Sequence, residues 1–181
     1  QVADLSTLNA FSSALLASRL DVRQLCRSLY AHTATVLSAP YFWLGLVHPQ
    51  HKRLEVAWAT AHGVEGDAVV PPAAAVLDWL QTKRQPLLIS DTRHEALPFA
   101  GDGASLDFRS GLFVTLQASG ELIGVLAVQS PESHAYDEND LRTLVTFANQ
   151  AAIAIQNAHF YEAEQRRARQ IAAVGEVSRR V

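Results

Sequence analysis

Hydrophobic residues along this chain change their spacing several times, and these changes predict the order of helices and strands. Residues 4–17 place apolar side chains three and four positions apart, which is typical of one face of an amphipathic helix. The spacing continues over 21–37, where Asp21 and Gln24 form a capping-box pattern at the start of a second helix. Pro40 stops this helix, because proline cannot continue it.

The periodicity then becomes two, which predicts strands. The segment 41–47 is rich in aromatic and β-branched residues, and 54–59 alternates between apolar and other side chains. Residues 48–52 form the turn between them, so the two strands make a hairpin. The following segment, 62–70, reads as a loop that contains glycine.

The middle of the chain combines a short helix, a short strand and a long loop. Two prolines introduce a helix over 73–83, since proline suits the first helical position. A strand over 87–90 ends at Asp91, whose side chain is expected to cap the next turn. Residues 92–109 then form a long loop, and loops of this length are usually functional lids or are disordered.

The last third predicts a second hairpin and a final helix. Strands over 112–116 and 122–129 are joined by a short link with a glycine, 118–121, which indicates a hairpin turn. Asp137 caps the final helix, whose apolar face runs over 141–155. Two hairpins with helices at the chain ends predict an α+β fold with a mainly antiparallel sheet.

Composition narrows the class of protein. A chain of 181 residues, 49% hydrophobic and 18% charged, is about one globular domain. A net charge of −3 gives no electrostatic footprint for nucleic acid or an anionic membrane, so neither is expected as a partner. The single cysteine, Cys26, suits a reducing compartment, and no apolar run is long enough to span a bilayer. We therefore expect a cytoplasmic location without direct membrane contact.

The two ends of the chain resemble each other. The apolar stripe of the first helix recurs, at one constant offset, near the C-terminus; its members are Leu5, Leu8, Phe11, Ser12 and Leu15, matched by Ile171, Val174, Val177, Ser178 and Val181. This similarity predicts one module of a longer chain of modules, although any two amphipathic helices share such a pattern. The charged tail from about residue 162 is expected to pair with another helix.

Three motifs stand out by their order and spacing. They are the stretch 86–91, Pro-Leu-Leu-Ile-Ser-Asp, the segment 120–129 with Gly120 and Gly124, and the segment 136–158 of the final helix. Together they resemble the GAF domain, a small-molecule sensor module of bacterial signalling proteins. The first is similar to a family pattern, although Lys83-Arg-Gln85 replaces its usual glycine turn, the second resembles the family's hairpin, and the third resembles its closing helix.

This resemblance implies a domain plan. A GAF/PAS-like central antiparallel sheet would carry the terminal helices on one face and a ligand-pocket region on the other. Residues 1–17 would form a linker and dimerisation helix, 18–160 the GAF domain, and 161–181 a signalling coiled-coil helix leading to a next module. Dimerisation would use residues 5–16 and 155–175, and a charged residue at Leu8 or Ile155 is expected to weaken it.

Five residues are candidates for ligand binding. Trp43, Trp58 and Trp79 lie on elements bordering the expected pocket, and each either stacks on a planar ligand or packs in the core. His94 lies in a segment expected near the pocket, as does His62, and either contacts a ligand or is an ordinary loop residue. Arg109 either pairs with an anionic ligand or faces solvent. The sequence identifies no catalytic residue, no metal ligand set and no particular cofactor.

The specialised activities of GAF relatives are not favoured. The cyclic-nucleotide signature of the family cannot be placed in this sequence. Cys26 lies on a helix, far from the expected pocket, so it is a poor anchor for a bilin. One cysteine cannot supply both a nucleophile and a resolving partner for reduction of free methionine sulfoxide.

The expected function is small-molecule sensing in a multidomain signal-transduction protein, with a sensor histidine kinase as the expected parent. Ligand state would pass through dimeric terminal helices to neighbouring domains of the same chain. The alternative is a ligand-free module that dimerises and spaces its neighbours.

Overall fold

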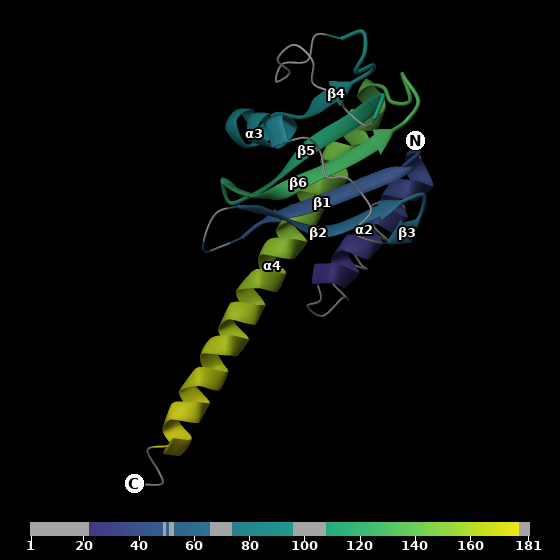
Figure 1. Cartoon of the computed structure of the whole chain (residues 1–181). Coiled ribbons are helices and arrows are strands. Elements are labelled where there is room, and N and C mark those ends of the chain that lie inside the picture. The colour runs from purple at the N-terminus through teal and green to yellow at the C-terminus, as the bar shows by residue number, and fades with distance from the viewer. Residues whose placement is uncertain (1–21, 49, 51–52, 66–73, 96–107, 178–181) are drawn as a thin grey trace.

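The computed structural model describes residues 22–48, 50, 53–65, 74–95 and 108–177, and their elements follow the predicted order (Figure 1). The helices are α2 (Val22–Val36), α3 (Ala74–Lys83) and α4 (Glu138–Val177). The strands are β1 (Tyr41–Val47), β2 (Leu54–Ala61), β3 (Val64–Glu65), β4 (Leu87–Ile89), β5 (Ser110–Ala118) and β6 (Glu121–Ser130). The first predicted helix, 4–17, and the cap at Asp21 lie outside the described residues.

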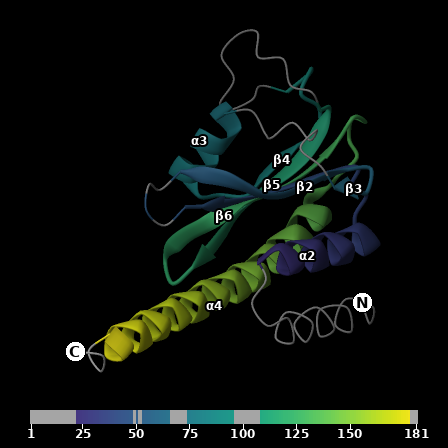
Figure 2. The same cartoon turned by 60° about the horizontal axis from the view of Figure 1, so that its bottom comes forward.

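The strands form one antiparallel sheet in the order β3-β2-β1-β6-β5-β4. Helices α2 and α4 cover one face and α3 covers the other (Figure 2). The central strands β1, β5 and β6 are therefore buried on both faces, which explains their nearly continuous apolar sequences. This arrangement confirms the predicted α+β fold.

Two apolar cores lie on opposite sides of the sheet. The helix-side core, between the sheet and α2 with α4, contains among others Leu25, Leu29, Phe42, Leu126, Leu144, Phe147 and Ile155. The α3-side core contains Trp43, Ala59, Val76, Leu80, Ile89, Phe108, Phe113, Val125 and Ala127. Residues along each strand alternate between the two cores, because successive side chains point to opposite faces of the sheet.

Some details differ from the expectations drawn from the sequence. Val36, an apolar residue within the predicted helix 21–37, is exposed. Strand β3 lies within 62–70, which was predicted as a loop. The short strand is held by tertiary contacts, since Glu65 accepts hydrogen bonds from Nε and Nη2 of Arg27 on α2 at 2.9 and 2.8 Å. This pairing also keeps the pKa of the Glu65 carboxyl below its ordinary value.

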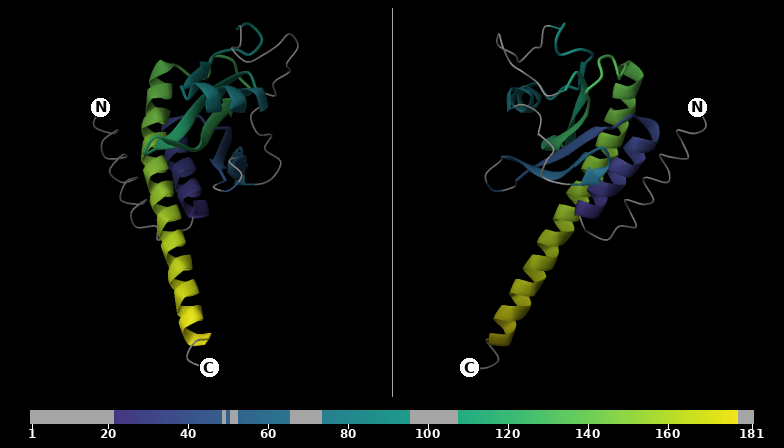
Figure 3. Two further views of the ribbon diagram at one scale, coloured as in Figure 1. Left: turned by 90° about the vertical axis from the view of Figure 1, so that its left-hand side faces the viewer. Right: turned by 45° about the vertical axis from the view of Figure 1, so that its right-hand side comes forward.

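Helix α4 begins where the sequence predicted. Oδ1 of Asp137 accepts hydrogen bonds from the backbone N–H groups of Asn139 and Asp140 at 2.7 and 2.9 Å. The side chain of Asp140 in turn accepts the N–H of Asp137 at 3.1 Å, which completes a reciprocal cap. The helix packs on the sheet as far as Ala158 and continues beyond the globular body (Figure 3).

Candidate functional site

The α3-side core contains a buried donor without a partner. Trp43 is 2% exposed, and its indole Nε1 has no hydrogen-bond partner in the structure. The indole Nε1 of Trp58, on the opposite face, likewise has no partner within hydrogen-bond distance, although Trp58 lies near enough to Glu65 to lower the pKa of that carboxyl. A buried donor without a partner costs about 1–3 kcal/mol relative to one that is satisfied. A ligand with an acceptor oxygen or nitrogen beside Nε1 of Trp43 would remove that cost.

Gly45 determines where the Trp43 indole lies. A Cβ atom at position 45 would be only 2.3 Å from Cη2 of Trp43, so the ring extends along β1 across this glycine. Helix α3 covers the same core through Val76 and Leu80, which are fully buried. The half-buried Trp79 of α3 also packs against it.

Polar side chains continue this face toward the end of the sheet. Gln129 on β6 is the register partner of Tyr41 on β1 and of Gly111 on β5. Tyr41 lies two residues before Trp43 on β1, so its side chain points to the same face of the sheet. Gln129 is buried, and the Tyr41 ring contacts His62 edge-on at a centroid distance of 5.1 Å. We therefore define the α3-side site as Trp43, Tyr41, Gln129, His62 and the half-buried Trp79.

Tyr41 and Gln129 were not among the residues predicted from the sequence. A signal was present for Gln129, because it is a polar residue at the end of the apolar strand Val125–Val128. Its position on the α3 side was not accessible from the sequence, since that depends on the register between β1 and β6.

Trp58 lies on the opposite side of the sheet from Trp43. Its ring packs in the helix-side core, with centroids 5.1 Å from Tyr30 and 5.6 Å from Phe42. The structure therefore separates two of the three candidate tryptophans. Cys26 is buried in the same helix-side core, across the sheet from the α3-side site.

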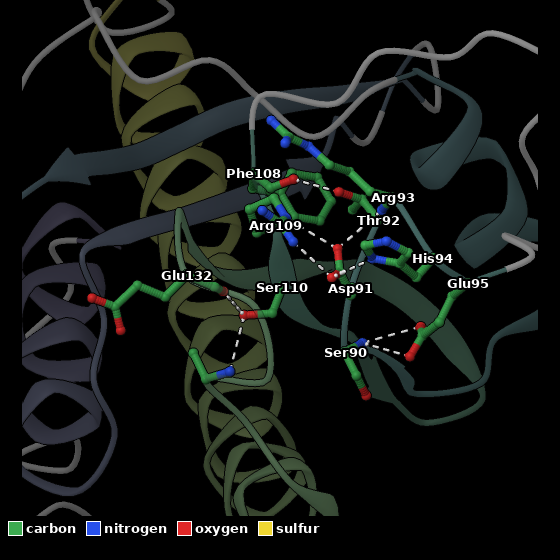
Figure 4. Close-up of polar contacts among 11 residues, drawn as sticks. Ser90, Asp91, Thr92, Arg93, His94, Glu95, Phe108, Arg109, Ser110 and Glu132 are labelled. Carbon is green, nitrogen blue, oxygen red and sulfur yellow. Dashed lines mark hydrogen bonds and ion pairs between the residues drawn. The ribbon is translucent and has the colours of Figure 1, made fainter.

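Arg109 and His94 meet at Asp91, at the base of the long loop (Figure 4). Arg109 donates from Nε to Oδ1 at 3.0 Å and from Nη2 to Oδ2 at 2.7 Å. Nδ1 of His94 lies 2.9 Å from Oδ2, although the His94 side chain is 78% exposed. Asp91 also accepts the backbone N–H of Arg93 at 3.0 Å, which confirms its predicted role as a turn cap.

These contacts join the two ends of the 92–109 segment. The backbone N–H of Thr92 donates to the carbonyl oxygen of Arg109, and its hydroxyl donates to that of Phe108, both at 2.8 Å. The Asp91–Arg109 ion pair lies beside them. The ends of the segment are therefore fixed against the sheet independently of any ligand.

The charges in this network are mutually compensated. Arg109 and then His94 hold the pKa of the Asp91 carboxyl well below its ordinary value, while Asp91 raises the pKa of Arg109. An anionic ligand at Arg109 would have to displace this carboxylate. Arg109 thus neither faces solvent freely nor offers an open cation, and we leave it and His94 out of the α3-side site.

The described residues contain neither a cluster of metal-ligating side chains nor a helix suited to spanning a membrane. Within the described ranges, no group of three His, Cys, Asp or Glu side chains is placed to hold a metal ion. No helix in the same part of the chain is both long and apolar enough to cross a bilayer.

Solved structures with the same fold come from proteins with different activities. The chain is similar to the GAF domain of a Coxiella burnetii phosphoenolpyruvate-protein phosphotransferase, with 18% identity, a TM-score of 0.68, and coverage of 88% of this chain and 96% of that one. Residues 122 to 287 of a methyl-accepting chemotaxis protein match with 24% identity, a TM-score of 0.67, and coverage of 84% and 99%.

An enzyme shares the fold as well. Free methionine-R-sulfoxide reductase from Neisseria meningitidis, solved with its substrate, matches with 18% identity, a TM-score of 0.68, and coverage of 87% and 91%. No curated protein sequence matches the chain. The GAF domain family model matches residues 19–156, which include the sheet, α2, α3, α4 as far as residue 156, and the α3-side site. This chain belongs to the GAF domain family.

Proposed function

We propose that this chain is the small-molecule-sensing module of a cytoplasmic, multidomain signal-transduction protein, and that the ligand binds at the α3-side site. The observation that carries the proposal is the buried, unpartnered Nε1 of Trp43 in the α3-side core. The Nε1 of Trp58 also has no hydrogen-bond partner, but it belongs to a side chain that interacts with the Glu65 carboxyl. Around Trp43 lie aromatic and apolar side chains with a few polar groups, the composition expected of a small-molecule site. The ligand class is a small organic molecule with an apolar body and one hydrogen-bond acceptor directed at Trp43.

Native mass spectrometry of the purified protein tests the ligand directly. Extra mass that is lost on denaturation would identify a retained molecule, which is then added back to variants. Trp43→Phe keeps an aromatic ring but removes the donor, so it should weaken binding by up to about tenfold, the value of one neutral hydrogen bond. Trp58→Phe is the matched control on the opposite face and should bind as the wild type does. Equal affinities for both variants would exclude binding at Trp43.

The output of this module would be carried by α4. Some apolar side chains of α4 are exposed to solvent. They include Ile153, Phe160 and Ile171, whose exposed fractions are 58%, 64% and 66%. Their spacings of seven and eleven residues place them along one side of a helix, opposite the face that packs on the sheet. We propose that this outward stripe pairs with the same stripe of a second copy of the chain.

One earlier expectation about the dimer needs correction. Ile155 is 1% exposed and belongs to the helix-side core, so a charge there would disrupt the fold rather than an interface. The appropriate variant is Ile153→Glu, with Val64→Glu as the control, because Val64 is an exposed apolar residue on edge strand β3. Sedimentation should show a weaker dimer for Ile153→Glu only. A monomeric wild-type protein, or a dimer unaffected by Ile153→Glu, would exclude this interface.

As the parent protein we propose a sensor histidine kinase, with α4 leading to its next module. The support is the resemblance of the chain ends to helices that join such modules in series. Incubation of the full-length protein with ATP should yield phosphohistidine. If no phosphohistidine formed and the parent protein carried an output domain of another kind, the kinase assignment would be wrong, but the sensing proposal would still hold.

A ligand-free scaffold is the second candidate, and one observation favours it. The α3-side core is filled by large side chains, and Trp43, Phe108 and Phe113 are each at most 6% exposed. A protein that carries no extra mass, and binds nothing in a ligand screen by thermal shift, but dimerises through Ile153, would establish this alternative.

A further inference from the structure

A chain of polar contacts connects α3 with α4 around the end of the sheet, although the two helices lie on opposite faces of it (Figure 2). We infer that this bridge couples the position of α3 to the segment where α4 leaves the globular body. The bridge consists of Arg84, the β5–β6 turn at Ser119 and Gly120, and Gln156. Its regulatory meaning rests on the proposed function, in which α3 covers the ligand and α4 carries the output.

The first part of the bridge is the C-terminal end of α3. Arg84 follows the helix with φ of +52°, and its backbone N–H donates to the carbonyl oxygen of Leu80 at 2.8 Å. Its side-chain Nη1 donates to the carbonyl oxygen of Gly120 at 3.1 Å, and Nε2 of Gln117 donates to the Arg84 carbonyl at 3.2 Å. The end of α3 is thus held against the β5–β6 hairpin from both sides.

The second part is a tight turn. Ser119 and Gly120 have φ angles of +53° and +79°, so both residues are left-handed, as in the two-residue hairpin turns that fit the twist of the strands. Ala118 pairs with Glu121 directly below the turn. Because so short a turn has little freedom, a displacement of the Gly120 carbonyl also displaces Ser119.

The third part is Gln156 on α4. The Ser119 hydroxyl donates to Oε1 of Gln156 at 3.2 Å, and Nε2 of Gln156 lies 3.5 Å from the carbonyl oxygen of Ala118. The position of Gln156 on the helix matters, because the neighbouring Ile155 and Ala158 are the last core residues in the described part of α4, while Phe160 is exposed. Gln156 therefore contacts the turn at the point where the helix loses its support from the sheet.

These contacts explain how a change on one face of the sheet reaches the other. Val76 and Leu80 place α3 on the Trp43 side, so a ligand that shifts α3 also shifts Arg84 at its end. The stiff turn transfers that shift to the Gln156 side chain. Helical geometry places Gln156 between the buried face of α4 and the outward stripe of Ile153 and Phe160, so its release loosens the helix beside the proposed dimer contact.

Hydrogen–deuterium exchange of the intact 181-residue chain, without ligand, tests the bridge. Val76→Ala loosens α3 from the sheet and should accelerate exchange of the α4 amides over 153–162 by about threefold or more, in line with the loss of modest hydrogen bonds. In a Gln156→Ala background, Val76→Ala should produce no further acceleration. Gln165→Ala is the matched control on the exposed part of α4 and should leave the Val76→Ala effect intact.

A second variant avoids the core altogether. Arg84→Gly removes the guanidinium and suits the left-handed backbone better than arginine does. It should accelerate exchange over 153–162 as Gln156→Ala does, and the double variant should match either single one. Independent, additive effects, or an unchanged α4 when α3 exchanges faster, would overturn the inference. Since no ligand is used, this result does not depend on whether Trp43 binds one.

Discussion

The Asp91 carboxylate is held by the Arg109 guanidinium through two hydrogen bonds, at 3.0 Å to Oδ1 and 2.7 Å to Oδ2, across 18 positions of sequence. Asp91 itself is buried, while a quarter of the arginine side chain is exposed. The pair joins the two described ends of the 92–109 segment. Its paired, two-bond geometry matches the planar fork of arginine, which lysine cannot reproduce.

The Asp91–Arg109 ion pair should make the stability of the protein depend on pH in the acidic range. The pKa of Asp91 is lower in the folded protein than its ordinary value, so the carboxylate stabilises the fold above about pH 4. That contribution is lost as the pH falls further, through the lowered folded-state pKa. Asp91→Asn should therefore lower the urea midpoint at pH 7, and its difference from the wild type should shrink toward pH 3. The exposed Asp78→Asn variant serves as control. Parallel pH profiles for Asp91→Asn and wild type would show that the ion pair does not stabilise the fold.

Gly45 should be coupled to Trp43 energetically. An added Cβ would meet Cη2 of the buried indole at 2.3 Å, so Gly45→Ala should reduce the free energy of unfolding by about 1–3 kcal/mol. In a Trp43→Phe background the clash is smaller, so the same substitution should cost less. A double-mutant cycle by urea denaturation measures the difference. Additive effects would mean that the indole moves aside freely.

Gly124 should tolerate substitution less well than Gly120. A Cβ at Gly124 would lie 2.3 Å from the backbone carbonyl oxygen of Gly45, which belongs to the neighbouring strand and cannot rotate away. At Gly120 the space is open, and only the left-handed φ of +79° opposes alanine, at a cost of about 1–2 kcal/mol. Gly124→Ala should therefore lower the melting temperature more than Gly120→Ala. The reverse order would contradict the strand contact.

Tyr136 should make the protein sensitive to alkali. Its hydroxyl donates to the Ser38 carbonyl oxygen at 2.9 Å, and burial raises its pKa above the ordinary value. The unfolded chain therefore ionises first, and stability falls as the pH rises beyond about 10. Tyr136→Phe should lose about 0.5–1.5 kcal/mol at pH 7, the value of one hydrogen bond. The gap between the two proteins in urea midpoint should narrow between pH 9 and 11; a constant gap would mean that Tyr136 ionises equally in both states.

Local chemistry was enough to predict most elements of the described part. The cap at Asp137, the turn that contains Gly120 and the buried face through Leu25 and Leu29 are set by neighbours a few residues apart. Such local interactions can therefore be predicted from the sequence alone. Motif order likewise identified the GAF family before any contact was known.

The composition of the two faces of the sheet was decided by the tertiary structure. Trp43 and Trp58 both lie on predicted strands, yet the register, which pairs Trp43 with Ala59 and Trp58 with Leu44, directs them to opposite cores. The same holds for Arg109, whose partner Asp91 is distant in sequence and whose charge is thereby compensated. Hydrophobic periodicity fixes which residues alternate, but only strand pairing and long-range contacts decide which face, and which partner, each side chain meets.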